Sequence, residues 1–251
     1  PRGPVRRLAF AARVASSPNF HPAAMARPAL RKIDPLLDLS RHLRSVEQVP
    51  VPWDGDALFA RRAPLEIEVG SGKGMFMVSA SGERPQHNFL GCELARNYAR
   101  LAAARLVRAG RDNAVMLQGD ALQLFREVLP DACAVAVHVY FPDPWWKQRH
   151  RKRRVMKPGF LADIERILEP GASLHFWTDV QEYFATTLTM IAEATGLLGP
   201  FDVSERPAGD EFDYRTHFER RMRLHDQPVY RAEFRRLAPT PESRADSAQA
   251  E

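Results

Sequence analysis

The sequence predicts an α/β fold built on a doubly wound, mostly parallel sheet. Short, continuously apolar segments recur along the chain, and amphipathic helical segments separate them. Strands that are apolar throughout are typical of a sheet covered by helices on both faces. Regular alternation of strands and helices is typical of parallel βαβ units. A chain of 251 residues is long enough for one such domain with short extensions.

The predicted elements follow one another in a regular order. The predicted strands are residues 65–69, 88–92, 114–117, 134–141 and 173–177. The predicted helices are residues 95–109, 160–168 and 181–194, and a further helix should follow the first strand. We therefore expect a folded domain over residues 65–237, an N-terminal extension over 25–64 and a disordered tail over 238–251.

The first 24 residues are rich in arginine and contain no acid. Such a leader is typical of an organelle transit peptide, or else translation starts at Met25 and the leader is not part of the protein. Arg13 interrupts the apolar stretch of this leader, which argues against a secretory signal. No apolar run approaches the length of a membrane span, so no membrane partner is expected. Cys92 and Cys133 lie far apart without a histidine cluster, so we expect reduced core residues and no metal site.

A glycine-rich segment, Glu68-Val69-Gly70-Ser71-Gly72-Lys73-Gly74, follows the first predicted strand. Glycines let the backbone turn sharply and approach a ligand where a Cβ atom would collide. The carboxyl edge of an α/β sheet is also where nucleotide-like cofactors bind. The spacing differs from the dinucleotide motif G-x-G-x-x-G, and no Ser or Thr follows the lysine as in a P-loop. Gly70 and Gly72 are thus candidate residues for binding another nucleotide-like cofactor.

Acidic residues at the ends of three successive predicted strands narrow the choice of cofactor. Glu68 can bind the ammonium of an amino-acid moiety, Glu93 the hydroxyls of a ribose, and Asp120 suits the adenine end. The alternative is that each is a solvated loop residue. A cofactor with both an ammonium and a ribose favours S-adenosylmethionine over NAD. The sequence therefore indicates a Rossmann-like S-adenosylmethionine-dependent methyltransferase fold.

The fourth predicted strand ends in Phe141-Pro142-Asp143-Pro144-Trp145. Two prolines hold Asp143 on a stiff backbone, which suits a catalytic group, although a simple proline turn has the same pattern. Residues 147–157 then contain seven Lys or Arg and no acid. The net charge of +5 says little about a partner, but such a local block favours contact with RNA or DNA phosphates. Trp145 or Trp146 is available to stack on a base.

Together these motifs resemble the signature of the bacterial tRNA (guanine-N7)-methyltransferases. The resemblance spans roughly residues 65–230. It includes the glycine segment, the proline–tryptophan motif with its basic run, Thr178-Asp179 and Arg215-Thr216-His217-Phe218-Glu219-Arg220-Arg221. It implies a cytoplasmic enzyme that transfers a methyl group from S-adenosylmethionine to N7 of a guanine in tRNA. The expected guanine is at position 46 of the variable loop.

The resemblance also implies roles for individual residues. Asp143 would be catalytic. The cofactor would contact Glu68, Gly70, Gly72, Glu93, Asp120 and Asp143. The substrate nucleotide would contact Lys147, Asp179, Thr216, His217, Phe218 and Glu219. The RNA would contact Arg149, His150, Arg151, Lys152, Arg153 and Arg154. The chain departs from the family at Met222, where a glycine is usual, and at Leu224-His225-Asp226-Gln227, where we expect a turn containing glycine.

Two other interpretations stay open. The protein could methylate another RNA, a free nucleotide or a protein, or it could be a non-catalytic RNA-binding subunit on a Rossmann-like core. The basic segment argues against a small substrate, and Glu68, Glu93 and Asp143 argue against an inactive site. The sequence does not distinguish a monomer from a homodimer.

Overall fold

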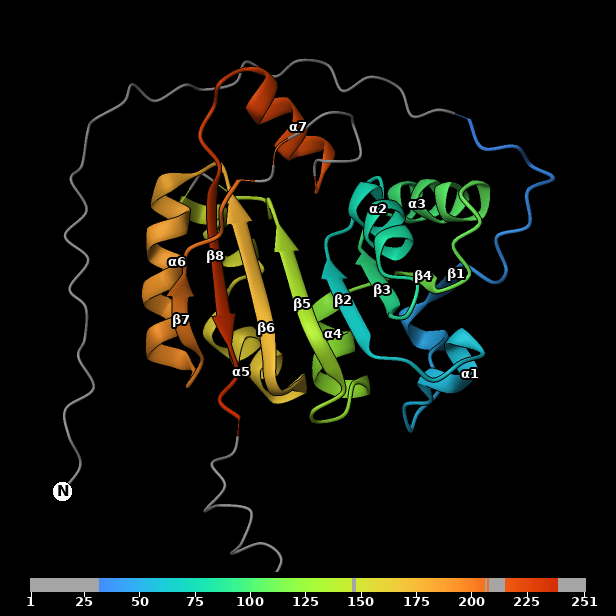
Figure 1. The fold of residues 1–251 in the computed structure, drawn as a ribbon, viewed down its shortest axis with the longest axis horizontal. Coiled ribbons are helices and arrows are strands. Elements are labelled where there is room, and N and C mark those ends of the chain that lie inside the picture. The colour runs from blue at the N-terminus through green and yellow to red at the C-terminus, as the bar shows by residue number, and fades with distance from the viewer. Residues whose placement is uncertain (1–31, 146–147, 206, 208–214, 239–251) are drawn as a thin grey trace, which may run out of the picture. The chain divides into compact units, whose positions relative to one another are not determined.

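The computed structural model describes residues 32–145, 148–205, 207 and 215–238. The leader at residues 1–24 and nearly all of the tail at 238–251 lie outside the described residues, so both expectations stay predictions. From Ile33 onward the chain forms one compact unit around a single sheet (Figure 1). Within the described ranges, no helix combines the length and the apolar character that crossing a membrane would require.

The sheet has eight strands in the order β1-β4-β3-β2-β5-β6-β8-β7. The first six strands are mutually parallel, whereas β8 runs antiparallel to both β6 and β7. The doubly wound, mostly parallel sheet is thereby confirmed. The strands are β1 (Leu43–Ser45), β2 (Leu65–Val69), β3 (Asn88–Glu93), β4 (Ala114–Gln118), β5 (Ala134–Tyr140), β6 (Leu168–Thr178), β7 (Leu198–Phe201) and β8 (Tyr230–Arg235).

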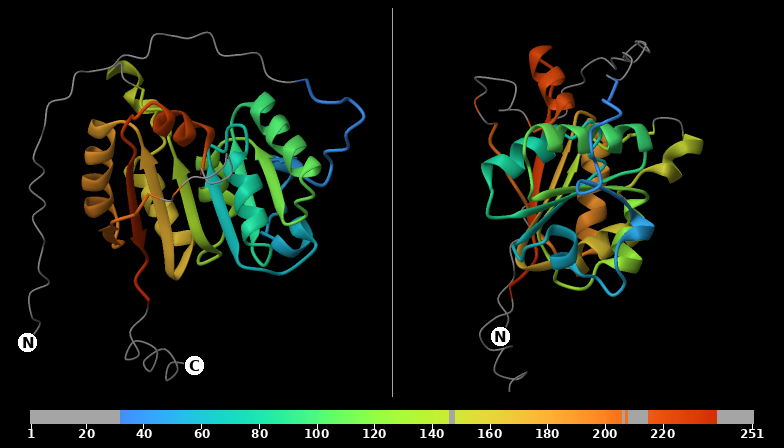
Figure 2. Two further views of the ribbon diagram at one scale, coloured as in Figure 1. Left: turned by 45° about the horizontal axis from the view of Figure 1, so that its top comes forward. Right: turned by 90° about the vertical axis from the view of Figure 1, so that its right-hand side faces the viewer.

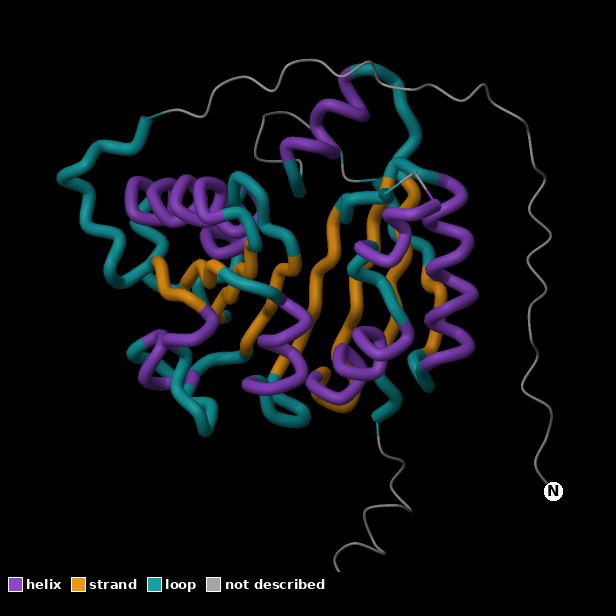
Figure 3. The backbone as a smooth tube through the Cα atoms, turned by 180° about the vertical axis from the view of Figure 1, so that it is seen from behind, coloured by secondary structure: helices purple, strands orange, loops and turns teal. Residues whose placement is uncertain are grey.

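Helices cover both faces of the sheet. The α-helices are α1 (Gly55–Phe59), α2 (Met75–Glu83), α3 (Arg96–Arg108), α4 (Ala121–Gln123), α5 (Pro158–Ile167), α6 (Gln181–Ala194) and α7 (His217–Leu224). Shorter helical segments are η1 (Val46–Gln48), η2 (Leu124–Val128) and η3 (Gln148–Arg153). Apolar residues of α2 and α3 form one core with the sheet, and those of α1, η2, α5 and α6 form the other. Figure 3 shows helices in front of the strands on the face turned away in Figure 1.

All five predicted strands and all three bounded helices are present, and their ends agree within two residues except in β6, which begins at Leu168 rather than at Ser173. Three strands were not predicted. The segment assigned to an N-terminal extension supplies β1, which pairs with β4. The strands β7 and β8 extend the sheet beyond β6.

The parallel strands β2 to β6 bring their carboxyl ends to one edge of the sheet. In Figures 1 and 2, α7 lies over this edge, beyond the arrowheads of β5 and β6. A segment close to the end of the chain therefore faces the loops that follow β2 and β5, which carry most of the predicted site.

Candidate active site

The glycine segment after β2 turns through three residues in the left-handed region, with φ of 78° at Gly70, 52° at Gly72 and 73° at Gly74. The three glycines differ in their surroundings. A Cβ atom on Gly70 would meet no atom within 4 Å, and one on Gly72 would meet only a carbonyl oxygen at 4.0 Å. A Cβ on Gly74 would lie 2.6 Å from the Cβ of Ala102 in α3. Gly74 thus permits α2 to pack on α3, whereas Gly70 and Gly72 border open space that a ligand can enter.

Glu93, at the end of β3, joins this loop to the start of α3. Its Oε2 atom accepts a hydrogen bond from the backbone N–H of Gly72 at 2.8 Å, and its Oε1 atom accepts one from Ala95 at 2.8 Å. Each carboxylate oxygen has a second lone pair for a ligand. Glu93 therefore fixes the loop and can also receive hydroxyl donors, as predicted for the ribose.

Glu68 is the most unusual acid of the site. It is 3% exposed, and within the described part of the chain its Oε2 atom has no hydrogen-bond partner. Burial raises the pKa of Glu68 to about 8; Ser71 opposes this shift and the neighbouring Glu93 carboxylate adds to it. A buried carboxyl oxygen without a partner is costly unless a ligand completes its hydrogen bonding. An ammonium group fits this position best, because it would also favour the ionised form.

Asp120 follows β4 and begins α4. Its Oδ1 atom caps the helix by accepting a hydrogen bond from the backbone N–H of Leu122 at 2.9 Å. The side chain is exposed, so its other oxygen faces outward. Because β4 lies beside β3, Asp120 stands at the same sheet edge as Glu93.

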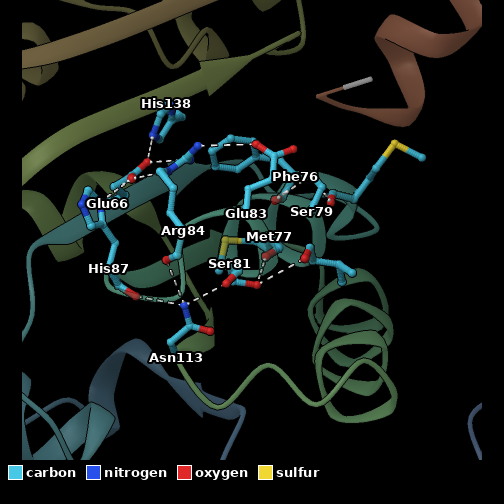
Figure 4. Close-up of polar contacts among 12 residues, drawn as sticks. Glu66, Phe76, Met77, Ser79, Ser81, Glu83, Arg84, His87, Asn113 and His138 are labelled. Carbon is cyan, nitrogen blue, oxygen red and sulfur yellow. Dashed lines mark hydrogen bonds and ion pairs between the residues drawn. The ribbon is translucent and has the colours of Figure 1, made fainter. Parts of the chain in front are cut away.

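A buried polar network lies on the sheet face beneath this edge (Figure 4). Glu66 of β2 receives two hydrogen bonds from Arg84, at 2.8 and 3.0 Å, and lies 2.7 Å from Nδ1 of His87 and 2.8 Å from Nε2 of His138. The other ring nitrogen of His138 lies 2.9 Å from the Tyr140 hydroxyl. Burial alone would raise the pKa of Glu66, but the contacts with His138 and Arg84 hold it well below its usual range. The network fixes the end of β5, from which the Asp143 loop departs.

The Asp143 loop leaves the sheet through two residues with left-handed backbone, Phe141 at φ 49° and Trp145 at φ 44°. The backbone N–H of Phe141 donates to the carbonyl of Trp177 in β6 at 2.8 Å. The Asp143 side chain is exposed, so it can reach a bound substrate. Asp143 thus presents an exposed carboxylate between two prolines, whose rings restrict the backbone around it.

Helix α7 contacts the Asp143 loop and the helix α3 beside the glycine segment. The ring of Phe218 lies against that of Phe141, with centroids 5.1 Å apart. The Nη1 atom of Arg105 in α3 lies 2.6 Å from Nε2 of His217, and it also donates to the carbonyl of Lys73 in the glycine segment at 3.0 Å. Because a guanidinium can only donate, Nε2 of His217 accepts. The chain around residue 217 is thereby fixed beside both the glycine segment and the Asp143 loop.

Two of the predicted substrate residues hold α7 in place. Thr216 caps the helix by accepting a hydrogen bond from the backbone N–H of Glu219 at 3.0 Å. Glu219 is 2% exposed and accepts from the backbone N–H of Arg215 at 2.6 Å. Its other oxygen lies 3.1 Å from Nη2 of Arg231 and 3.6 Å from Nη1 of Arg223. Because Glu219 accepts from Arg215 and not from Thr216, the arrangement resembles a capping box whose return bond goes to the residue before the cap.

The remaining predicted residues fall in three settings. Asp179 is half-buried at the end of β6; burial raises its pKa, and the Arg221 guanidinium opposes the shift. Lys147 and Trp146 lie outside the described residues. In η3 and the residue after it, Arg149, Lys152 and Arg153 are exposed, whereas His150 and Arg154 are half-buried. The His150 ring packs edge-on against Trp145 at 5.8 Å.

Comparisons with known proteins show the family of the chain and the class of its fold. A family model described as "Putative methyltransferase" matches residues 62–232. The fold resembles a solved 16S rRNA methyltransferase, KamB, with a TM-score of 0.54 at 16% identity over 74% of this chain and 94% of that one. The chain therefore belongs to a family of methyltransferases.

Curated relatives define the family more closely. A tRNA (guanine-N(7)-)-methyltransferase of Rhodopirellula baltica is 48% identical over 84% of this chain and 80% of its own length. A tRNA (guanine-N(7)-)-methyltransferase of Cupriavidus necator is 36% identical over 77% of this chain and 74% of its own length. The chain is a member of the tRNA (guanine-N7)-methyltransferase family, and its methyl donor is S-adenosylmethionine.

Sequence reasoning did not identify two residues that organise the site. Arg105 bridges Lys73 and His217, but nothing in its helical spacing distinguishes it from the other arginines of α3. Arg231 pairs with Glu219 from a strand that was not predicted. The helix cap itself could have been predicted, because Thr216 and Glu219 have the spacing of a capping box.

Proposed function

We propose that this protein methylates N7 of the guanine at position 46 of tRNA, in the cytoplasm, with Asp143 as its catalytic residue. Family membership supports the reaction and the class of substrate. The structural observation that carries the proposal is Glu68, a buried carboxylate with an unpartnered oxygen beside two glycines that border open space. That arrangement suits a cationic, nucleotide-like methyl donor.

The donor supplies a methyl group already activated by the positive sulfonium. Glu68 would bind its ammonium, Glu93 its ribose hydroxyls and Asp120 its adenine end. Glu93 is preorganised for this role because the backbone of Gly72 and Ala95 fixes both carboxylate oxygens. Fixed acceptors lose little conformational entropy when the ligand arrives.

The acceptor atom requires little chemical activation. Guanine N7 carries a lone pair and no proton at neutral pH, so catalysis consists mainly of placing it in line with the methyl group. The product base is cationic, and a carboxylate beside it favours the transition state. Asp143 has the exposure for this task, and the Phe141–Phe218 pair supplies an aromatic surface for a base extruded from the tRNA fold.

The rest of the site would bind the polynucleotide. Arg149, Lys152 and Arg153 are exposed on one short segment after the Asp143 loop, where they can neutralise phosphates. Asp179 can accept hydrogen bonds from the guanine edge. Thr216 and Glu219 contribute by fixing α7, so that Phe218 and His217 face the substrate.

The test is to incubate unmodified tRNA with the protein and labelled S-adenosylmethionine and to map N7-methylguanine along the chain. We expect the label at guanine 46 and none in a tRNA with adenine at that position. Asp143→Asn should slow single-turnover transfer about 10²-fold with both substrates saturating. A near-wild-type rate would show that Asp143 is only a turn residue. Methylation at another guanine, or of another RNA only, would contradict the proposed substrate.

A further inference from the structure

Arg154 differs from Arg149, Lys152 and Arg153 in that its side chain is half-buried rather than exposed. It turns toward the Asp143 loop. Its Nε atom donates a hydrogen bond to the carbonyl of Pro144 at 2.7 Å. Pro144 directly follows Asp143, so this bond holds the peptide next to the proposed catalytic carboxylate.

The guanidinium of Arg154 has a second fixed contact. Its Cζ atom lies 4.5 Å from the centre of the Tyr183 ring. Tyr183 is 1% exposed in the first turn of α6, and its ring packs edge-on against Phe176 of β6 at 6.0 Å. A cation over a buried aromatic face is a stronger contact than the same pair at the surface. The Arg154 guanidinium therefore packs on the core of the domain and does not extend freely into solvent.

These contacts join the two loops that carry the acids of the substrate site. Tyr183 lies in the first turn of α6, four residues after Asp179, and Pro144 follows Asp143. Burial raises the pKa of Tyr183 to about 12; the Arg154 charge opposes this shift and the Asp143 charge adds to it. Both charges thus act on the same ring. Arg154 spans from the loop after β5 to the helix after β6.

The Asp143 loop needs such an external support. Pro142 and Pro144 have no backbone N–H to donate, so the loop can form few hydrogen bonds of its own. Phe141 is fixed at the start of the loop through Trp177. Arg154 supplies the corresponding bond at the far side of Asp143.

We propose that Arg154 is a positioning residue for methyl transfer: by binding the Pro144 carbonyl and the Tyr183 ring, it holds Asp143 against the substrate and does not bind RNA phosphate. The proposal rests on the proposed role of Asp143. Its nearest control is Lys152, which is two residues away, carries the same charge and is exposed.

The test compares Arg154→Ala, Arg154→Lys and Lys152→Ala in the full chain, with tRNA affinity measured at several salt concentrations and transfer measured in single turnover. Lysine keeps the charge but loses the Nε–H donor and the planar face. We expect both Arg154 variants to transfer methyl about 10- to 100-fold more slowly at saturating tRNA, since small misplacement of reacting groups is costly. Their tRNA affinity and salt slope should stay within error of the wild type.

Lys152→Ala should instead act on binding: tRNA affinity should fall, and the log–log salt slope should be reduced by about 0.7–0.9. Equal melting temperatures and cofactor affinities would exclude misfolding as the cause of the rate loss. The proposal is overturned if Arg154→Ala weakens tRNA binding with a reduced slope and Arg154→Lys restores it. It is also overturned if both Arg154 variants transfer at the wild-type rate.

Asp143→Asn in the same assay separates the two proposals. A slow Asp143→Asn together with fast Arg154 variants would reject only the role of Arg154. A wild-type rate for Asp143→Asn would reject the role of Asp143, and slow Arg154 variants would then show that the loop positions another group.

Discussion

The Oε1 atom of Glu219 lies 3.1 Å from Nη2 of Arg231, in an ion pair whose side chains are 3% and 8% exposed. Glu219 belongs to α7 and Arg231 to β8, so the pair attaches α7 to the sheet. The Arg231 guanidinium also lies over the Trp177 ring at 5.0 Å. Breaking a buried pair by removing one partner leaves an uncompensated charge and costs far more than breaking a surface pair.

Glu219→Ala should therefore lower the free energy of unfolding by about 3 kcal/mol, measured by urea denaturation. We expect the lower end of the usual range because Glu205 remains 3.1 Å from Arg231. Glu205→Ala is the matched control. The Glu205 side chain is 52% exposed, so its loss should cost less than about 1 kcal/mol. Equal effects of the two substitutions would contradict the assignment of Glu219 as the anchor of α7.

Asp226→Gly should stabilise the protein slightly. Helix α7 ends in a Schellman motif, in which Gln227 N–H donates to the Met222 carbonyl at 2.8 Å and Asp226 N–H to that of Arg223 at 3.2 Å. Asp226 holds the left-handed position at φ 50°, where glycine is preferred. We expect a gain of about 0.5 kcal/mol in thermal denaturation.

The end of α3 provides the control for that substitution. Gly110 occupies the same position of the same motif at φ 61°, and a Cβ there would meet no atom within 4 Å. Gly110→Asp should therefore destabilise by a similar amount through backbone strain alone. Changes of the same sign at both positions would show that the left-handed residue does not set the stability of these caps.

The stability of the unliganded protein should depend on pH through Glu68. Its pKa is about 8 in the folded state against 4.5 ordinarily, so the folded protein keeps a proton that the unfolded chain releases between these values. The free energy of unfolding contributed by this group falls as pH rises through that window. Glu68→Gln removes this titration. The free energy of unfolding of the variant, relative to that of the wild type, should therefore rise by at least about 2 kcal/mol from pH 5 to pH 8.

That comparison is made by urea denaturation of both proteins at the two pH values. A difference in stability that does not change with pH would contradict the raised pKa. The same carboxyl should release a proton when the methyl donor binds below pH 8, because an ammonium partner favours its ionised form. Calorimetric titration in buffers of different ionisation enthalpy measures that release, and Glu68→Gln should abolish it.

Glu93→Ala should weaken binding of S-adenosylmethionine by about 1–3 kcal/mol, measured by calorimetry. The substitution removes the proposed ribose acceptor and also releases the backbone N–H groups of Gly72 and Ala95. Glu93→Gln keeps one acceptor oxygen and should lose less. Unchanged affinity in a folded Glu93→Ala variant would contradict both the ribose role and the bridging role.

The sequence predicts the strands whose residues face apolar layers on both sides of the sheet, and it misses strands with one apolar face or none. Strands such as Leu65–Val69 are buried throughout, so their pattern is clear. In β8 only Ala232 and Phe234 face the core, while the alternating residues are charged. The strand β7 contains a glycine and a proline and is exposed along its length. Such strands form because neighbouring strands recruit them, which local sequence does not encode.

The site divides in the same way. The acids at the ends of β2 and β3 and just after β4 could be predicted because each stands at the end of a recognisable strand, and parallel topology brings strand ends together. The contacts of α7 could not, because Arg105 and His217 are 112 residues apart and meet only in the folded protein. The inward direction of the Arg154 side chain could not be predicted either. It lies in a run of similar cations, and the sequence gives the charge of each residue but not the direction of its side chain.

The position of β8 has a consequence for synthesis of the protein. Among the described residues it is the last strand along the chain, yet it lies between β6 and β7, and it carries the arginine that anchors α7. While the ribosome is still translating residues 230–235, the strands β2 to β4 with Glu68, Glu93 and Asp120 are already complete, but β7 lacks the strand with which it pairs and α7 lacks Arg231. A nascent chain can therefore assemble the glycine segment and its neighbouring strands early, and the half that carries α7 is completed only when β8 emerges.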